Sequence, residues 1–152
     1  IQTVKDAGLY VDAETADLAA RKSMGHPYMV QLVGYYMWRS AVRRDSRVIE
    51  ERDVEAGHAD AVSEFYEAVD APLYYGLHSP QRLFIEAMAA DGGKPTRMAD
   101  IIERCDRTQS WASKYRASLI RERVIEAAGY GLVRFTVPML GAYIRDRVIW
   151  HE

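Results

Sequence analysis

The sequence predicts a mainly α-helical protein with two modules: a small helical bundle over residues 1–75, and a winged helix-turn-helix domain with a β-hairpin wing over residues 79–152. Three observations support this prediction. Apolar residues recur at helical spacing through most of the chain. Two β-prone runs flank a Gly-Tyr-Gly turn near its end, which is typical of a hairpin. Helix-breaking residues gather between Gly76 and Pro80, where a linker is expected.

The first helix of the bundle is expected to run from Asp12 to about Met24. Asp12 is a suitable N-cap because its carboxylate can accept a hydrogen bond from a free backbone N–H group, and Glu14 lies favourably in the first turn. Gly25 is expected to end this helix, because glycine tolerates the left-handed conformation that a helix end requires.

The second helix is expected to start at Pro27, where the missing backbone N–H has no partner to lose. From Tyr28 to Trp38, apolar side chains point in every direction around the helix axis, so this helix needs cover on all sides. A three-helix unit covers only one or two of those sides. The sequence leaves two interpretations open: the helix packs against a partner outside this chain, or it is a well-wrapped core helix.

A third helix is expected to start from a cap at Asp53, with apolar residues following at helical spacing. The charged stretch from Arg43 to Arg52 is interpreted as a solvated helix end and loop. Pro72 and the region from Gly76 to Pro80 are expected to break the helical pattern and to form the linker.

Short helices and a hairpin are expected after the linker. Ser79 is expected to cap the segment "SPQRLFIEAMAADG", "TRMADIIERC" forms the next helix, and Thr108 caps "QSWASKYRASLIRER". The turn within "VIEAAGYGLVRFTV" predicts a hairpin, and Pro138 is expected to open a last helix. This order of elements is that of a helix-turn-helix with a wing.

The helix after Thr108 is the candidate for reading the DNA major groove. If Trp111, Tyr115 and Leu119 form its inner stripe, polar side chains able to bind base edges or phosphates face outward. The opposing interpretation is a solvated face that only keeps the domain soluble. The candidate DNA-binding residues are Gln109, Ser110, Ser113, Lys114, Arg116 and, on the wing, Arg134, with Arg107 and Arg121 flanking them.

The charge distribution gives limited support to DNA binding. Residues 79–152 carry 12 Lys and Arg against 9 Asp and Glu, a net charge of +3, whereas residues 1–78 carry 8 against 13, a net charge of −5. The change of sign favours two modules with different partners, with ordinary scatter as the alternative explanation. A net charge of +3 is weak for a DNA-binding domain.

No catalytic or metal-binding pattern is recognisable. The chain has no phosphate-binding loop of the form G-x-x-x-x-G-K-[ST], and its single cysteine, Cys105, is expected to be a small buried hydrophobe. One cysteine and the lack of a signal peptide favour the cytoplasm, and the apolar run at Pro27–Trp38 is too short to span a membrane. The histidines are not spaced like zinc ligands; they are His26, His58, His78 and His151.

The stretch "MGHPYMVQLVGYYMW" resembles the segment after the Walker motifs in P-loop ATPases of the AAA+/STAND type, which include initiator-like ATP-binding proteins of bacteria and archaea. In those proteins a "G-x-P" motif starts a helix of the small helical lid, and "IEERDVEAGHADAV" is similar to the following lid helix. The tail "GLVRFTVPMLGAYI" resembles the end of their C-terminal winged helix.

This resemblance implies that residues 1–75 are a lid and that a nucleotide-binding domain precedes Ile1. ATP and Mg²⁺ are then implied for the parent protein, and no cofactor or turnover for this fragment. The resemblance places His26, Pro27, Tyr28 and Gln31 near the adenine side of the nucleotide. Tyr28 stands where initiator ATPases often have a nucleotide-sensing arginine, and a tyrosine can stack on a base but cannot pair with a γ-phosphate.

Two functions from different classes follow from the sequence. The first is a fragment of a P-loop ATPase whose winged helix contacts double-stranded DNA. The alternative is a winged helix that docks on its own ATPase domain or on a neighbour, as a regulatory module without DNA binding, with self-association as its expected sign. A complete small transcription regulator is a third possibility, which the acidic helical half and the missing start methionine disfavour.

Overall fold

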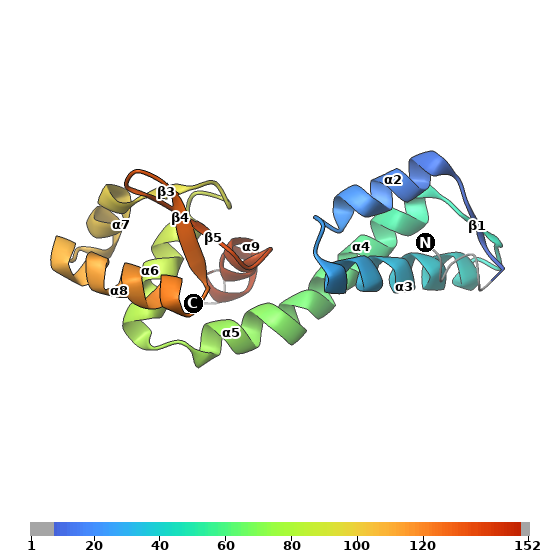
Figure 1. Ribbon diagram of the computed structural model, residues 1–152. Helices are drawn as coiled ribbons and strands as arrows, with labels where there is room; N and C mark the ends of the chain where they lie inside the picture. Colours follow the sequence, from blue (N-terminus) through green and yellow to red (C-terminus); the bar gives the residue numbers. More distant parts are fainter. Residues whose placement is uncertain (1–7, 150–152) are drawn as a thin grey trace. The chain divides into compact units, whose positions relative to one another are not determined.

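The computed structural model describes residues 8–149, and the chain divides into two compact units between Glu67 and Ala68. The protein is mainly α-helical, with a small antiparallel sheet in the second unit (Figure 1). The predicted fold class is therefore confirmed. The division precedes the expected linker, so helix α5 (Ala71–Gly76), which the sequence assigned to the first module, belongs to the second unit.

The first unit contains helices α2 (Ala13–Lys22), α3 (Pro27–Arg43) and α4 (Glu51–Phe65). The side chain of Asp12 accepts a hydrogen bond from the Thr15 amide at 2.7 Å, which confirms the predicted cap of α2. The helix ends earlier than expected, at Lys22, and Met24 adopts a left-handed φ of +51° before Gly25, whose φ is +70°. Helices α3 and α4 form the core of the first unit. Their fully or almost fully buried residues are Met29, Val33, Met37, Ala41, Val54, Ala61 and Phe65.

Helices α3 and α4 approach most closely at Gly57, in the middle of α4. A Cβ atom at this position would lie 2.6 Å from the backbone nitrogen of Met37 and 2.8 Å from the carbonyl carbon of Tyr36. No side chain fits there without moving one helix backbone away from the other. Gly57 therefore sets the distance between the two helices.

The start of α4 differs from the prediction. Asp53 is not the N-cap, because Glu50 occupies that position and Asp53 lies in the first turn, where its side chain accepts from the Glu50 amide. The segment from Arg43 to Arg52 is not simply a solvated helix end and loop, as the sequence suggested. It contains strand β2 (Val48–Ile49), which pairs in parallel with β1 (Tyr10–Val11).

Pro72 does not end the helix as expected. A π-helical turn, η1 (Tyr66–Asp70), follows α4 and leads directly into α5, and Pro72 lies in the first turn of α5. A proline clashes with the carbonyl four residues before it in a regular helix. The wider π turn relieves that clash, so the helical path continues.

The second unit contains α6 (Ser79–Ala89), α7 (Met98–Cys105), α8 (Gln109–Arg121) and α9 (Leu140–Tyr143), which leads into the π turn η2 (Ile144–Val148). Strands β4 (Ile125–Gly129) and β5 (Leu132–Phe135) form the predicted hairpin. A strand that the sequence analysis missed, β3 (Thr96–Arg97), pairs antiparallel with β5. The sheet order β3–β5–β4 completes a winged helix.

Three helix starts in this unit test the predicted caps. Thr108 caps α8, and its hydroxyl accepts from the Trp111 amide at 3.1 Å, as predicted. Ser79 is the first helical residue rather than the cap, which is His78, whose amide donates to the Gln81 side chain at 3.0 Å. The last helix begins at Leu140 rather than at Pro138, because Met139 adopts a left-handed φ of +68° before it.

Candidate nucleic-acid interface

Helix α8 is held in place by its inner side. Ala112 and Leu119 are completely buried, and the Trp111 ring lies 6.2 Å from that of Phe84 on α6. The Gln81 side chain of α6 donates a hydrogen bond to the Ser118 hydroxyl at 2.7 Å. These contacts fix the rotation of α8 about its own axis, and with it the identity of the outward side.

The outward side of α8 is a single stripe of exposed residues, which we call the α8 face: Ser110, Lys114, Ala117 and Arg121. Their spacing of four, three and four residues places them in one row along the helix. Gln109 and Ser113 are also exposed beside this row. Serine and alanine are short, so a flat surface or a groove can come close to the helix backbone.

The cations of α8 have no carboxylate partner in the described part of the chain. Helix α8 contains no acidic residue. Within residues 8–149, no carboxylate forms an ion pair with Lys114, Arg116 or Arg121. The Lys114 ammonium lies 5.4 Å from the centre of the Tyr115 ring, a cation–π distance that leaves its charge available.

The wing arginine has a different environment. Arg134 lies opposite Glu126 in the hairpin register, and its Nε is 2.6 Å from the Glu126 carboxylate. Two more arginines of this unit, Arg97 and Arg104, pair with Asp100 and Asp91. The unpaired positive charge near the α8 face therefore comes from α8 itself rather than from the wing.

The structure groups the six predicted residues unevenly. Gln109, Ser110, Ser113 and Lys114 lie together on the exposed side of α8, Arg116 is half-buried at its edge, and Arg134 is engaged on the wing. Sequence reasoning missed Tyr130, whose side chain is fully exposed at the wing tip between Gly129 and Gly131. The Gly-Tyr-Gly turn in the sequence could have indicated that Tyr130 is exposed at the tip of the hairpin.

The four residues expected near a nucleotide do not form one cluster. The ring of His26, the N-cap of α3, meets that of Phe65 edge-on at 5.2 Å, and its Nδ1 is buried without a partner among the described residues. The ring of Tyr28 lies 5.9 Å from that of Phe65. Pro27 and Gln31 are exposed. The rings of His26 and Tyr28 therefore both pack on Phe65, and both side chains remain partly exposed.

The residues that the structure describes do not cover helix α3 completely. Met29 and Val33 are buried, but Val30, Tyr35 and Val42 remain 47%, 50% and 49% exposed. Within residues 8–149, part of this helix is therefore uncovered.

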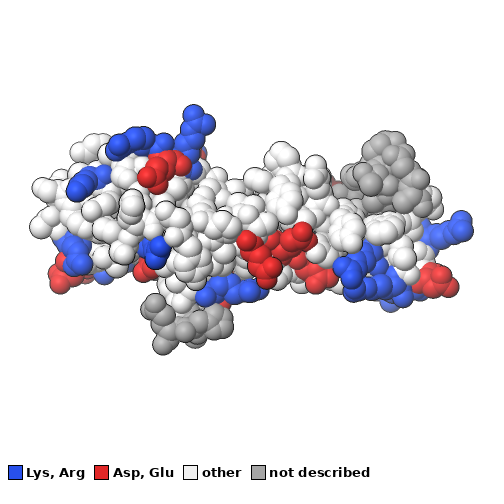
Figure 2. Space-filling model, turned by 90° about the horizontal axis from the view of Figure 1, so that it is seen from below, with Lys and Arg blue, Asp and Glu red and all other residues white. Residues whose placement is uncertain are grey.

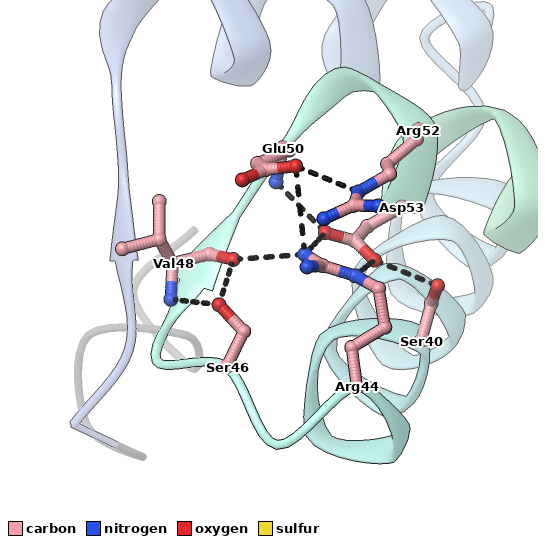
Figure 3. A network of polar contacts seen from close by, with 7 residues as sticks. All are labelled: Ser40, Arg44, Ser46, Val48, Glu50, Arg52 and Asp53. Carbon is pink, nitrogen blue, oxygen red and sulfur yellow. Dashed lines mark hydrogen bonds and ion pairs between the residues drawn. The ribbon is translucent and has the colours of Figure 1, made fainter.

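A buried polar network joins α3 to the start of α4 (Figure 3). The Asp53 carboxylate is completely buried and accepts from Ser40 Oγ at 2.7 Å and from Arg44 Nε at 3.0 Å. Burial alone would raise the pKa of Asp53, but the hydrogen bonds from Arg44, the Glu50 amide and Ser40 outweigh it and lower that pKa. The network is structural, because its groups satisfy one another.

Asp70, at the end of the π turn, has the opposite environment. Its side chain is completely buried, and neither carboxylate oxygen has a hydrogen-bond partner in the described part of the chain. Burial raises the pKa of Asp70 to about 7. Because the folded protein holds this proton more tightly than the unfolded chain, stability falls as pH rises from about 4 to about 7.

Replacing Asp70 by asparagine is therefore expected to stabilise the protein at pH 8 and to change little near pH 4. The amide removes the ionisation that opposes folding while it keeps the size of the side chain. We expect the melting temperature at pH 8 to rise by about 5 °C. Thermal denaturation at both pH values checks this, and an equal shift at both would contradict the assigned cause.

The other candidate chemistries find little support. Burial raises the pKa of the Cys105 thiol, which makes it a poor nucleophile. Within residues 8–149, no group of three or more His, Cys, Asp or Glu residues is arranged to hold a metal ion, and His151 lies outside this range. In the same range, no helix combines the length and apolar character needed to cross a membrane.

Comparison with known proteins singles out the second unit. Residues 71–144 match a family described as a domain of unknown function, DUF8462. The match begins with α5 and ends at the start of η2, so it covers the winged helix and none of α2, α3 or α4. No curated protein and no solved structure matches the chain.

Proposed function

We propose that the second unit binds double-stranded DNA through the α8 face. The observation that supports this best is the row of Ser110, Lys114, Ala117 and Arg121, exposed along a helix that has no acidic residue. The B-DNA major groove is wide enough to admit an α-helix. Short side chains in this row allow the helix to enter the groove before its two cations meet the phosphates.

Each part of α8 has a distinct role in this proposal. Gln109 and Ser110, in the first turn, reach the base edges, as the N-terminal residues of recognition helices do. The free N–H groups of that turn favour a phosphate nearby. Lys114 and Arg121 neutralise phosphates further along. With so few cations available, binding is expected to be weak and strongly dependent on salt.

Reversing the charge of both Lys114 and Arg121 to glutamate is expected to weaken DNA binding by roughly 10- to 100-fold at low salt. Both side chains are exposed, so the fold should remain intact. Fluorescence anisotropy with a short labelled duplex measures the affinity. The matched control is Arg21→Glu with Arg52→Glu, an equal charge change at side chains that are 69% and 63% exposed in the first unit.

Two results would contradict the DNA proposal. One is the absence of binding by the unaltered chain at low salt. The other is an equal loss of affinity in the control, because it would mean that only net charge matters. Either result would favour the alternative, a protein-contact module, for which the fully exposed Tyr130 at the wing tip is the specific supporting observation.

We further propose that this chain is the C-terminal part of a cytoplasmic P-loop ATPase. The support is the resemblance of the segment around His26 and Pro27, with α3 starting at Pro27 as that resemblance implies. Tyr28 packs on Phe65, which favours a structural role over nucleotide sensing. A phosphate-binding loop encoded upstream of Ile1 would support the proposal. Calorimetry should show no ATP affinity of this chain tighter than about 1 mM, and tight binding would contradict it.

A further inference from the structure

A regular row of side chains follows the outer side of α3. Tyr28, Gln31, Tyr35, Trp38 and Val42 are separated by alternating steps of three and four residues, the spacing with which one helix packs on another. We call this row the α3 seam. It contains no charged residue, and the rings of Tyr35 and Trp38 lie 6.0 Å apart within it. Such a row on an uncovered helix side indicates a contact surface.

Basic side chains lie beside one half of the α3 seam. Arg39 and Arg43 are exposed next to its C-terminal half, and no carboxylate forms an ion pair with either among the residues described. Together with Asp60 of α4, they line a hollow of about 200 Å³ between the two helices. This places the basic side chains on the flank that α3 shares with α4.

Acidic side chains lie beside the other half. Helix α4 runs antiparallel to α3, since Ser40 contacts Asp53 near one end and Tyr28 contacts Phe65 near the other. Glu64 accepts a hydrogen bond from the Tyr36 hydroxyl, near the middle of α3. Glu67 follows in the π turn η1, beyond the end of α4 that lies beside Tyr28. Figure 2 shows an acidic and a basic group next to one another on one side of this unit.

We propose that two copies of this chain associate through the α3 seam, with the two α3 helices antiparallel about a two-fold axis at Tyr35. Positions 28 and 42, and positions 31 and 38, are placed almost evenly about residue 35. Each Tyr35 therefore meets Tyr35 of the second copy. Tyr28 faces Val42 of the second copy, and Gln31 faces Trp38 of the second copy. The amide of Gln31 can accept the indole N–H, so the polar position in the seam also finds a partner.

The charges on the flank match the same arrangement. A two-fold axis that reverses the helix direction keeps the α4 side of one copy next to the α4 side of the other. Arg39 and Arg43 then face the acidic end of α4 in the second copy, where Glu67 is exposed and Glu64 is held by the Tyr36 hydroxyl, and these contacts occur twice. A hollow of about 400 Å³ lies beside Trp38 and Val42, at the end of the seam that faces Tyr28 of the second copy. This self-complementarity points to a second copy as the occupant of the seam.

Sedimentation velocity of the whole chain over a range of concentrations tests for the dimer. Tyr35→Glu should raise the dimer dissociation constant by about 30-fold or more, because the exposed side chain at the axis is replaced twice by a charge. The matched control is Val30→Glu, at a side chain of α3 that is 47% exposed but lies outside the seam, and it should leave the dimer unchanged. A chain that stays monomeric at every concentration, or a dimer insensitive to Tyr35→Glu, would overturn the proposal.

A charge exchange tests the antiparallel geometry separately. Arg43→Glu and Glu67→Arg should each weaken the dimer by several-fold, and the double variant should restore it, since both new contacts pair opposite charges. A double variant that is weaker than both single variants would overturn the antiparallel arrangement. Circular dichroism of each variant establishes that the fold is retained, which the exposure of both side chains leads us to expect.

Discussion

Replacing Gly57 by alanine is expected to lower the free energy of unfolding of the first unit by about 2 kcal/mol or more. The added Cβ would lie 2.6 Å from the Met37 backbone nitrogen, and a backbone atom cannot rotate away as a flexible side chain can. Helices α3 and α4 must then separate along their length. That separation weakens the packing of Met37, Ala61 and the other buried residues between them.

Gly34→Ala is the matched control for this prediction. Gly34 is also a glycine inside a helix, but a Cβ atom there meets nothing within 4 Å. Alanine stabilises a helix interior relative to glycine, so Gly34→Ala should raise stability by up to about 1 kcal/mol. Urea denaturation followed by circular dichroism measures both variants. Equal stabilities would mean that the close approach at Gly57 has no energetic consequence.

Replacing Asp53 by alanine is the second change expected to have a large effect, a loss of about 2–3 kcal/mol at pH 7. Its carboxylate accepts from Ser40, from Arg44 and from the Glu50 amide, and removal leaves these donors without their acceptor. The value lies at the low end for a buried ion pair, because the Arg44 side chain is 25% exposed and water can solvate it.

The Asp53 effect should depend on pH in a defined direction. The pKa of Asp53 is lowered in the folded protein, so its carboxylate stabilises the fold at pH values above the ordinary value of about 4. That contribution is lost as pH falls through the folded pKa. The difference between the unaltered protein and Asp53→Ala should therefore shrink below about pH 4, and a difference that is constant with pH would contradict an ionic role.

Arg52→Ala is the control for the Asp53 prediction. Arg52 also forms an ion pair in this network, with Glu50 at 2.7 Å, but both side chains are largely exposed. Exposed pairs contribute little to stability, because water screens them and two long side chains must be ordered. Arg52→Ala should therefore leave the urea midpoint almost unchanged, whereas Asp53→Ala lowers it clearly.

Local signals in the sequence predicted much of the fold correctly. Asp12 and Thr108 cap their helices through side-chain contacts within three residues, which a short sequence pattern contains. The hairpin was likewise predicted from the glycines that flank Tyr130.

Features that depend on distant contacts were not predictable in the same way. Asp53 looks like a cap in sequence, but Glu50 takes that position directly after β2, a strand that is defined by its pairing with the distant β1. Strand β3 is too short to show a period and is defined by β5. From sequence alone, Arg134 on the wing was expected to be available for DNA. The hairpin register places Glu126 opposite it, and the two form an ion pair.

The dependence of DNA affinity on salt tests the central claim most directly. For B-DNA, the slope of log affinity against log salt is about −0.9 for each phosphate that the protein neutralises. If Lys114 and Arg121 both contact phosphates, replacing both by alanine should make the slope less steep by about two. A slope that stays the same in Lys114→Ala/Arg121→Ala as in the unaltered chain would show that DNA does not lie on the α8 face.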